Sequence, residues 1–256
     1  MKITKIETLI CNARMRNWIF VKVLTDPPGL YGWGEATLEW HTRSVIGAIE
    51  DLSQLIIGED PTRVEHLWQM MFRQHFWHGN GIVRATAIAG IDLALWDIMG
   101  KVAGLPVHRL LGGAGRRQIL AYASSINWGD DARAEAETRD CLARGFRAIK
   151  VKIGQTPRAA IARAELIRKI AGPEIRLSVD ANWAFDLDEA TQVGEALATL
   201  DYWWFEEPIV PEDVEGYRLL RAWLDDRPAG VGLTERFTRL LDEPLIPSSL
   251  RAELPI

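Results

Sequence analysis

The sequence predicts an α+β domain over residues 1–113 followed by an incomplete TIM-type (β/α) barrel over residues 114–256. Two observations support this fold class. In the first part, short segments of alternating apolar and polar residues give way to longer segments with helical spacing. In the second part, short apolar strands alternate with amphipathic helices, which is typical of a parallel sheet. The 256 residues are enough for two domains with cores of their own.

Three strands and three helices are expected in the first domain. The strands cover residues 3–10, 18–25 and 30–36, and turn residues such as Pro28-Gly29 separate the last two. The first helix follows the strands, the second opens at Pro61, and the third runs over residues 85–102. Because the third helix is apolar on most sides, it should be buried.

Four helices alternate with strands in the second domain. The best delimited one begins at Pro157, with Thr156 as its N-cap, and ends before Gly172-Pro173. The others are expected at about residues 131–144, 187–199 and 212–224. Strand and helix in regular succession indicate parallel strands joined by helical crossovers.

Charged residues end three successive apolar runs of the second domain: Lys150 and Lys152, then Asp180 with Asn182, then Glu206. The step from Lys150 to Asp180 is 30 residues and the step from Asp180 to Glu206 is 26, close to the roughly 30 residues of a βαβ unit. Taken singly, such motifs are more often a solvated strand face, a turn or a helix start. Their common spacing places them together at the C-terminal end of the strands, where barrel active sites lie. Lysines beside carboxylates there suggest a base next to a divalent metal.

The composition excludes several classes of partner. A net charge of −5 and a pI near 5.6 argue against binding to nucleic acid or an anionic membrane. No apolar stretch reaches the roughly 18 residues of a membrane helix, and the N-terminus lacks the apolar core of a signal peptide. Two cysteines in a chain of this length indicate a reduced, cytoplasmic protein.

Several long motifs resemble one known family. The run Ala87–Lys101, continued by Pro106–Gly112, resembles the signature helix of the mandelate racemase and muconate lactonizing enzymes in the enolase superfamily. The stretch from Leu177 to Pro208 resembles the second family signature. Within the family, Gly32-Trp33-Gly34-Glu35 and neighbouring segments are most similar to acid-sugar dehydratases of the galactonate type. The resemblance covers about residues 1–225 and implies that the first domain is an enolase-type capping domain.

The resemblance implies a set of site residues. Lys152 would be the general base that removes the proton α to a substrate carboxylate, and Lys150 would lower the pKa of Lys152 through its like charge. Mg²⁺ would be the cofactor. Its ligands would be Asp180, Glu206 and Glu235, the last preceded by threonine where the family has glycine. Because Glu235 departs from the family pattern and Asp180 and Glu206 alone supply only part of an octahedral shell, we expect weak Mg²⁺ binding. Substrate-binding residues would be Arg14, Trp18, His41 and Asn182.

The reaction implied is Mg²⁺-dependent dehydration of a small-molecule sugar acid to a 2-keto-3-deoxy acid. The alternatives are a mandelate racemase-like racemase or epimerase and a truncated, non-catalytic remnant of such an enzyme. A complete barrel takes about 250 residues, whereas residues 115–256 number 142. We therefore expect strands six to eight to be missing, through a natural truncation or a frameshift, and dehydration by this chain to be very slow. Which acid sugar is used and whether the chain forms homo-oligomers are left open.

Overall fold

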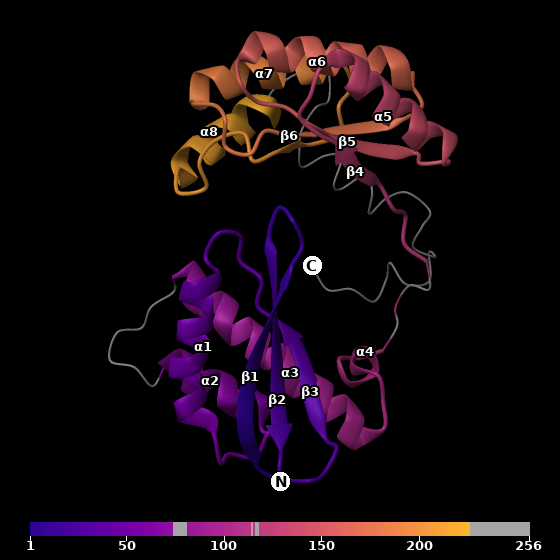
Figure 1. The fold of residues 1–256 in the computed structure, drawn as a ribbon. Helices are drawn as coiled ribbons and strands as arrows, with labels where there is room; N and C mark the ends of the chain where they lie inside the picture. The colour runs from indigo at the N-terminus through magenta and orange to yellow at the C-terminus, as the bar shows by residue number, and fades with distance from the viewer. Residues whose placement is uncertain (74–80, 114, 116–117, 226–256) are drawn as a thin grey trace, which may run out of the picture. The chain divides into compact units, whose positions relative to one another are not determined.

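The computed structural model describes residues 1–73, 81–113, 115 and 118–225. Its contacts divide the chain into two units, Met1–Arg117 and Gln118–Ile256 (Figure 1). The domain boundary that the sequence places after residue 113 stays a prediction. None of the helices in the described part of the chain is long and apolar enough to cross a membrane.

The first unit contains an antiparallel sheet in the order β1-β2-β3. The strands are β1 (Ile3–Asn12), β2 (Asn17–Thr25) and β3 (Tyr31–Glu35). The helices are α1 (Thr42–Ile56), α2 (Val64–Arg73), α3 (Ile82–Ala103) and the short α4 (Val107–Leu110). This arrangement confirms the predicted three strands followed by helices.

The second helix begins later than predicted. Pro61 lies in a turn in which the backbone N–H of Arg63 donates to the carbonyl oxygen of Asp60. The Asp60 side chain accepts from both the backbone N–H and the hydroxyl of Thr62, at 3.0 and 2.8 Å. These contacts satisfy the groups before the helix, so α2 starts at Val64 and not at Pro61.

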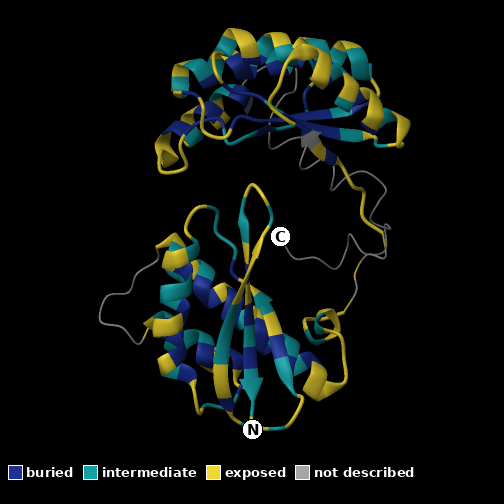
Figure 2. Cartoon of the chain, in the orientation of Figure 1, coloured by how far each residue is buried: buried dark blue, intermediate teal, exposed yellow. Residues whose placement is uncertain are grey.

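Helix α3 packs directly on strand β3. A Cβ at Gly32 would lie 1.9 Å from the carbonyl oxygen of Ala94, and one at Gly34 would lie 1.9 Å from that of Gly90. Only glycine permits this approach of two backbones. Facing residues of β2 and α3 fill the core beside this contact, and they are fully buried: Ile19, Val21, Val23, Ile91, Leu95 and Ile98 (Figure 2). The predicted burial of the third helix is confirmed for this face only, because Ile82, Leu93 and Val102 on the same helix are 51 to 64% exposed.

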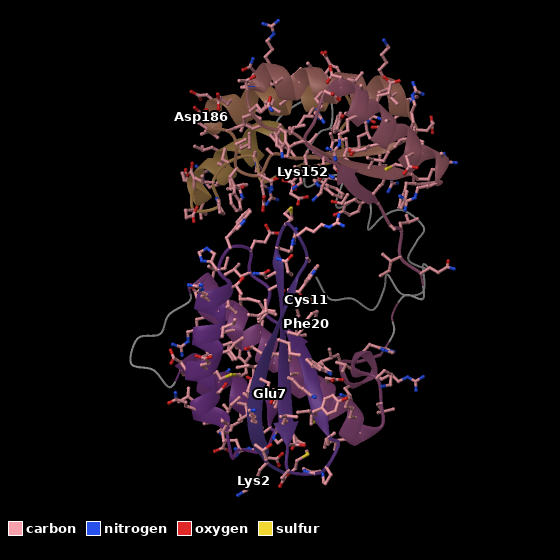
Figure 3. The ribbon with its side chains drawn as sticks, in the orientation of Figure 1. Lys2, Glu7, Cys11, Phe20, Lys152 and Asp186 are labelled. Carbon is pink, nitrogen blue, oxygen red and sulfur yellow. The ribbon has the colours of Figure 1, made fainter. Side chains whose placement is uncertain are left out.

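The opposite face of the antiparallel sheet is open among the described residues. Alternation along the strands points Cys11 and Phe20 away from the helices, and both are exposed (Figure 3). Leu9, Trp18 and Trp33 share this face and are 37 to 44% exposed.

The described residues of the second unit form a four-stranded parallel sheet in the order β4-β5-β6-β7. Its strands are β4 (Ala123–Ile126), β5 (Ala148–Lys152), β6 (Arg176–Asp180) and β7 (Phe205–Glu206). The intervening helices are α5 (Asp131–Ala143), α6 (Pro157–Ala171), α7 (Leu187–Thr199) and α8 (Val214–Asp225). Helices α5, α6 and α7 lie side by side along one face of the sheet (Figure 1). Four parallel strands are half of a closed eight-stranded barrel, as the predicted incomplete barrel requires.

Polar side chains cap the N-termini of three of these helices. Asp130 accepts a hydrogen bond from the backbone of Arg133, and Thr156 caps α6 with Pro157 in the first turn as predicted. Asp186 forms a complete capping box with Glu189. These caps fix the loops that leave the C-terminal ends of the strands.

Candidate active site

The parallel register brings the predicted charged residues together. Lys152 at the end of β5 pairs with Asp180 at the end of β6, and Asp180 pairs in turn with Glu206 of β7. Lys150, two residues before Lys152, lies on the same face of β5. The side chains therefore occupy one end of three adjacent strands, as the spacing in the sequence predicts.

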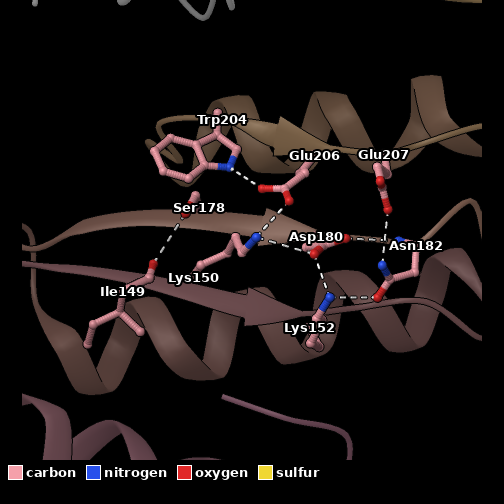
Figure 4. A network of polar contacts seen from close by, with 9 residues as sticks. All are labelled: Ile149, Lys150, Lys152, Ser178, Asp180, Asn182, Trp204, Glu206 and Glu207. Atoms are coloured by element: carbon pink, nitrogen blue, oxygen red, sulfur yellow. Dashed lines mark hydrogen bonds and ion pairs between the residues drawn. The ribbon is translucent and has the colours of Figure 1, made fainter. Parts of the chain in front are cut away.

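Two ammonium groups and two carboxylates form a continuous network (Figure 4). The Lys150 Nζ lies 2.6 Å from Glu206 Oε1 and 3.3 Å from Asp180 Oδ2. The Lys152 Nζ donates to Asp180 Oδ2 at 2.5 Å and to Asn182 Oδ1 at 2.8 Å. Asp180 is thus shared by both lysines, and its second oxygen accepts the backbone N–H of Asn182 at 3.1 Å.

Burial and pairing shift the pKa values of this network in opposite directions. Lys150 is 8% exposed, and burial alone would lower its pKa, but the hydrogen bond and charge of Glu206 and the charge of Asp180 outweigh this effect. The pKa of Lys150 therefore lies above its ordinary value. Burial would raise the pKa of Asp180, yet hydrogen bonds from Lys152 and the Asn182 backbone lower it overall. Both groups are stabilised in their charged forms.

Aromatic side chains line the network on the side toward the N-termini of the strands. The Trp204 indole N–H donates to Glu206 Oε2 at 3.1 Å, opposite the oxygen that Lys150 contacts. The Tyr122 ring packs edge-on against Trp204, and the Lys150 Nζ lies 5.9 Å from its centre. Sequence reasoning missed Trp204, which lies directly before β7 and is therefore not placed by the alternation within that strand.

The loop after β7 adds a second contact that sequence reasoning missed. The Asn182 amide nitrogen donates to Glu207 Oε2 at 3.0 Å, so Asn182 links Lys152 to Glu207 (Figure 4). The backbone N–H of Trp183 donates to the carbonyl oxygen of Glu207 at 2.8 Å. Asn182, Trp183 and Glu207 all have positive φ, at 46°, 63° and 47°. The loops after β6 and β7 are therefore held together by both backbone and side-chain contacts.

The donor chemistry of the network fits a Mg²⁺ ion in part. Asp180 and Glu206 present hard carboxylate oxygens from neighbouring strand ends, which suits this ion. Among the residues that the structure describes, no three His, Cys, Asp or Glu side chains form a group that could hold a metal. Glu235, the third predicted ligand, lies outside the described residues. The fit therefore rests on two carboxylates.

The other predicted substrate-binding residues belong to the first unit. Arg14 lies in the turn between β1 and β2 with a φ of 65°, Trp18 follows on β2, and His41 directly precedes α1. An ion pair of 2.7 Å between Arg16 and Glu39 connects the turn to the segment before α1. The three residues are exposed. Their role, like that of Asn182, stays a prediction.

Comparison with known proteins matches both units of the chain. Residues 5–112 match the N-terminal domain of the mandelate racemase / muconate lactonizing enzyme family, and residues 131–242 match the enolase C-terminal domain-like family. Sequence relatives include a D-galactonate dehydratase of Ralstonia pickettii, 38% identical, and a D-galactarolactone cycloisomerase of Agrobacterium fabrum, 33% identical. Each alignment covers 87% of this chain, with 59% of the first relative and 62% of the second.

A solved structure agrees with this assignment. An enolase from Pantoea ananatis with bound D-gluconate and Mg is 28% identical, with a TM-score of 0.76 over 86% of this chain and 63% of that one. The chain thus spans about three fifths of the length of the curated relatives it matches.

Proposed function

The chain belongs to the mandelate racemase / muconate lactonizing enzyme family of the enolase superfamily, and from this premise we propose that its lysine–carboxylate network removes the proton α to the carboxylate of a sugar acid. The observation that carries the proposal is the register of three strand ends. It places the amine of Lys152 within hydrogen-bonding distance of Asp180, while Glu206 pairs with Asp180 on the next strand.

Each residue of the network would have its own role in this proton transfer. Lys152 would accept the α-proton at Nζ once that nitrogen is neutral. Asp180 and Asn182 would hold the amine in place, and Lys150 with Trp204 would hold the two oxygens of Glu206. A Mg²⁺ ion held by Asp180 and Glu206 would stabilise the negative charge that develops on the substrate carboxylate, as in enolase-superfamily sites generally.

Dehydration is the second step that we propose. It is supported by the relatives named D-galactonate dehydratase at 36 to 38% identity and by the neighbouring structure with bound D-gluconate and Mg. Elimination of the β-hydroxyl would then give a 2-keto-3-deoxy acid. A cycloisomerase is the second candidate, because relatives with that name also match this chain. Removal of an α-proton is compatible with either outcome.

The proposal is tested by exchange of the α-proton in D₂O. The 256-residue chain is incubated with Mg²⁺ and D-galactonate or D-gluconate, and loss of the α-proton signal is followed by NMR. We expect slow exchange that disappears in Lys152→Ala and persists in Lys169→Ala, which removes an exposed lysine on α6. Exchange that continues in Lys152→Ala, or none in the unsubstituted chain, would contradict the proposal. Appearance of a 2-keto-3-deoxy acid distinguishes dehydration from isomerisation.

A further inference from the structure

Side chains at or just after the ends of three strands form a chain of contacts, and its last member, Glu207, has no role in the proposed proton transfer. The Lys152 Nζ donates to the Asn182 side-chain oxygen at 2.8 Å. The Asn182 side-chain nitrogen donates to Glu207 Oε2 at 3.0 Å. Figure 4 shows the amide of Asn182 between the other two groups. The carboxylate of Glu207 therefore reaches Lys152 through one amide.

The chemistry of the two outer groups determines which way the amide points. A lysine ammonium only donates hydrogen bonds, and an ionised carboxylate only accepts them. The Asn182 amide satisfies both neighbours in one orientation, with its oxygen toward Lys152 and its nitrogen toward Glu207. The flipped amide would place a donor against the ammonium and an acceptor against the carboxylate, and both contacts would be lost.

The backbone supports the same arrangement. Glu207 and Asn182 both have left-handed φ values, which cost a non-glycine residue energy and are common where a site fixes a side chain. The Glu207 carbonyl oxygen accepts the N–H of Trp183, so the backbone bond between the two loops does not depend on the Glu207 side chain. A substitution of the Glu207 side chain therefore leaves the atoms of this backbone bond in place.

We propose that Glu207 is a positioning residue that fixes the orientation of the Asn182 amide and, through it, the amine of Lys152. The proposal rests on the proposed function, because a fixed amine matters only if Lys152 meets a substrate. It assigns Glu207, the second glutamate of the Glu-Glu-Pro motif, a role distinct from metal binding.

The test compares variants that keep or remove the acceptor. Glu207→Met is close in size but offers no carboxylate, whereas Glu207→Gln retains an oxygen that can accept from Asn182. Glu212→Met is the matched control, because Glu212 is an exposed residue of the same loop. Two quantities are measured: the ¹H–¹⁵N signals of the Asn182 side-chain amide, assigned by their loss in Asn182→Ala, and the rate at which Lys152 is acetylated, followed by mass spectrometry.

In the unsubstituted chain, one Asn182 amide proton should be shifted downfield by the carboxylate. Glu207→Met should lose this shift and raise acetylation of Lys152 about fivefold, the size of one net hydrogen bond. Glu207→Gln and Glu212→Met should keep both properties. The bond from the Trp183 N–H to the Glu207 carbonyl does not involve the substituted side chain. A role of Glu207 limited to that bond would therefore leave the amide shift and the acetylation rate unchanged in every variant.

Two outcomes would overturn the proposal. The first is an ordinary, unshifted Asn182 amide in the unsubstituted chain, which needs no variant to fold. The second is a Glu207→Met variant whose amide signals and Lys152 acetylation match those of Glu212→Met. Neither measurement depends on turnover, so an absence of α-proton exchange with the amide shift intact would count against the proposed function alone.

Discussion

The Lys152 ammonium and the Asp180 carboxylate meet at 2.5 Å although 28 residues separate them along the chain. The parallel pairing of β5 with β6 places them directly opposite each other. The same carboxylate oxygen also forms an ion pair with Lys150 Nζ at 3.3 Å. A cation that binds Asp180 must therefore compete with two ammonium groups already paired to it.

This competition predicts weak Mg²⁺ binding. Titration calorimetry of the chain with Mg²⁺ should give a low affinity that Asp180→Asn abolishes, because Asp180 supplies one of two carboxylates and Lys150 and Lys152 occupy it. Asp188→Asn removes an exposed carboxylate from the first turn of α7 and should leave binding unchanged. Tight binding that survives Asp180→Asn would show that the metal binds elsewhere.

Asp180 should also make stability depend on pH in the acid range. Its folded-state pKa is lowered by Lys152, the Asn182 backbone and Lys150 against the effect of burial. Its contribution to the free energy of unfolding is therefore present above the ordinary carboxyl pKa of about 3.9 and is lost as the pH falls through the lower folded value. Urea unfolding in EDTA should show Asp180→Asn as less stable than the unsubstituted chain at pH 7, with the difference shrinking below about pH 4. A difference that stays constant down to pH 2 would contradict this.

Tyr202 should make stability depend on pH in the alkaline range. Its hydroxyl is buried and donates to the carbonyl oxygen of Ala164 at 2.9 Å, and burial raises its pKa well above the ordinary value, against the charge of Arg168. Its contribution to stability is present below the unfolded pKa of about 10 and is lost as the pH rises toward the folded value. Between pH 10 and 11 the unfolding free energy should fall less steeply in Tyr202→Phe, by up to about 1.4 kcal/mol per pH unit. Equal slopes in both proteins would refute the assignment.

Gly34→Ala should destabilise the first unit. The added Cβ would lie 1.9 Å from the carbonyl oxygen of Gly90, so β3 and α3 must move apart. Overpacking of this kind costs about 1–3 kcal/mol, measured by chemical denaturation. Gly47→Ala is the control: nothing lies within 4 Å of its added Cβ on α1, and a helical glycine replaced by alanine should gain about 0.5–1 kcal/mol. Equal effects of the two substitutions would show that the close contact is absent.

The spacing of charged residues was enough to predict where Lys150, Asp180 and Glu206 meet. Parallel strands joined by helices repeat at a regular interval, and alternation within a strand decides which face a side chain takes. The observed pairing of Lys152 with Asp180 agrees with these two regularities.

The contacts of Trp204 and Glu207 could not be predicted in the same way. The Trp204 contact depends on an aromatic rotamer, and the Glu207 contact depends on two loops with left-handed residues, Asn182 among them. Strand periodicity carries no information about either. The start of α2 was missed for a related reason, because the Asp60 side chain bonds the turn where Pro61 suggested a helix start.

The residues buried in the two units form two hydrophobic clusters with no member in common. Lys150, Lys152, Asp180 and Glu206 all belong to the unit with the parallel sheet, while Arg14, Trp18 and His41 belong to the other. A substitution near the β1–β2 turn should therefore leave the packing around the lysines unchanged. Each unit can thus accumulate substitutions within its own core independently of the other.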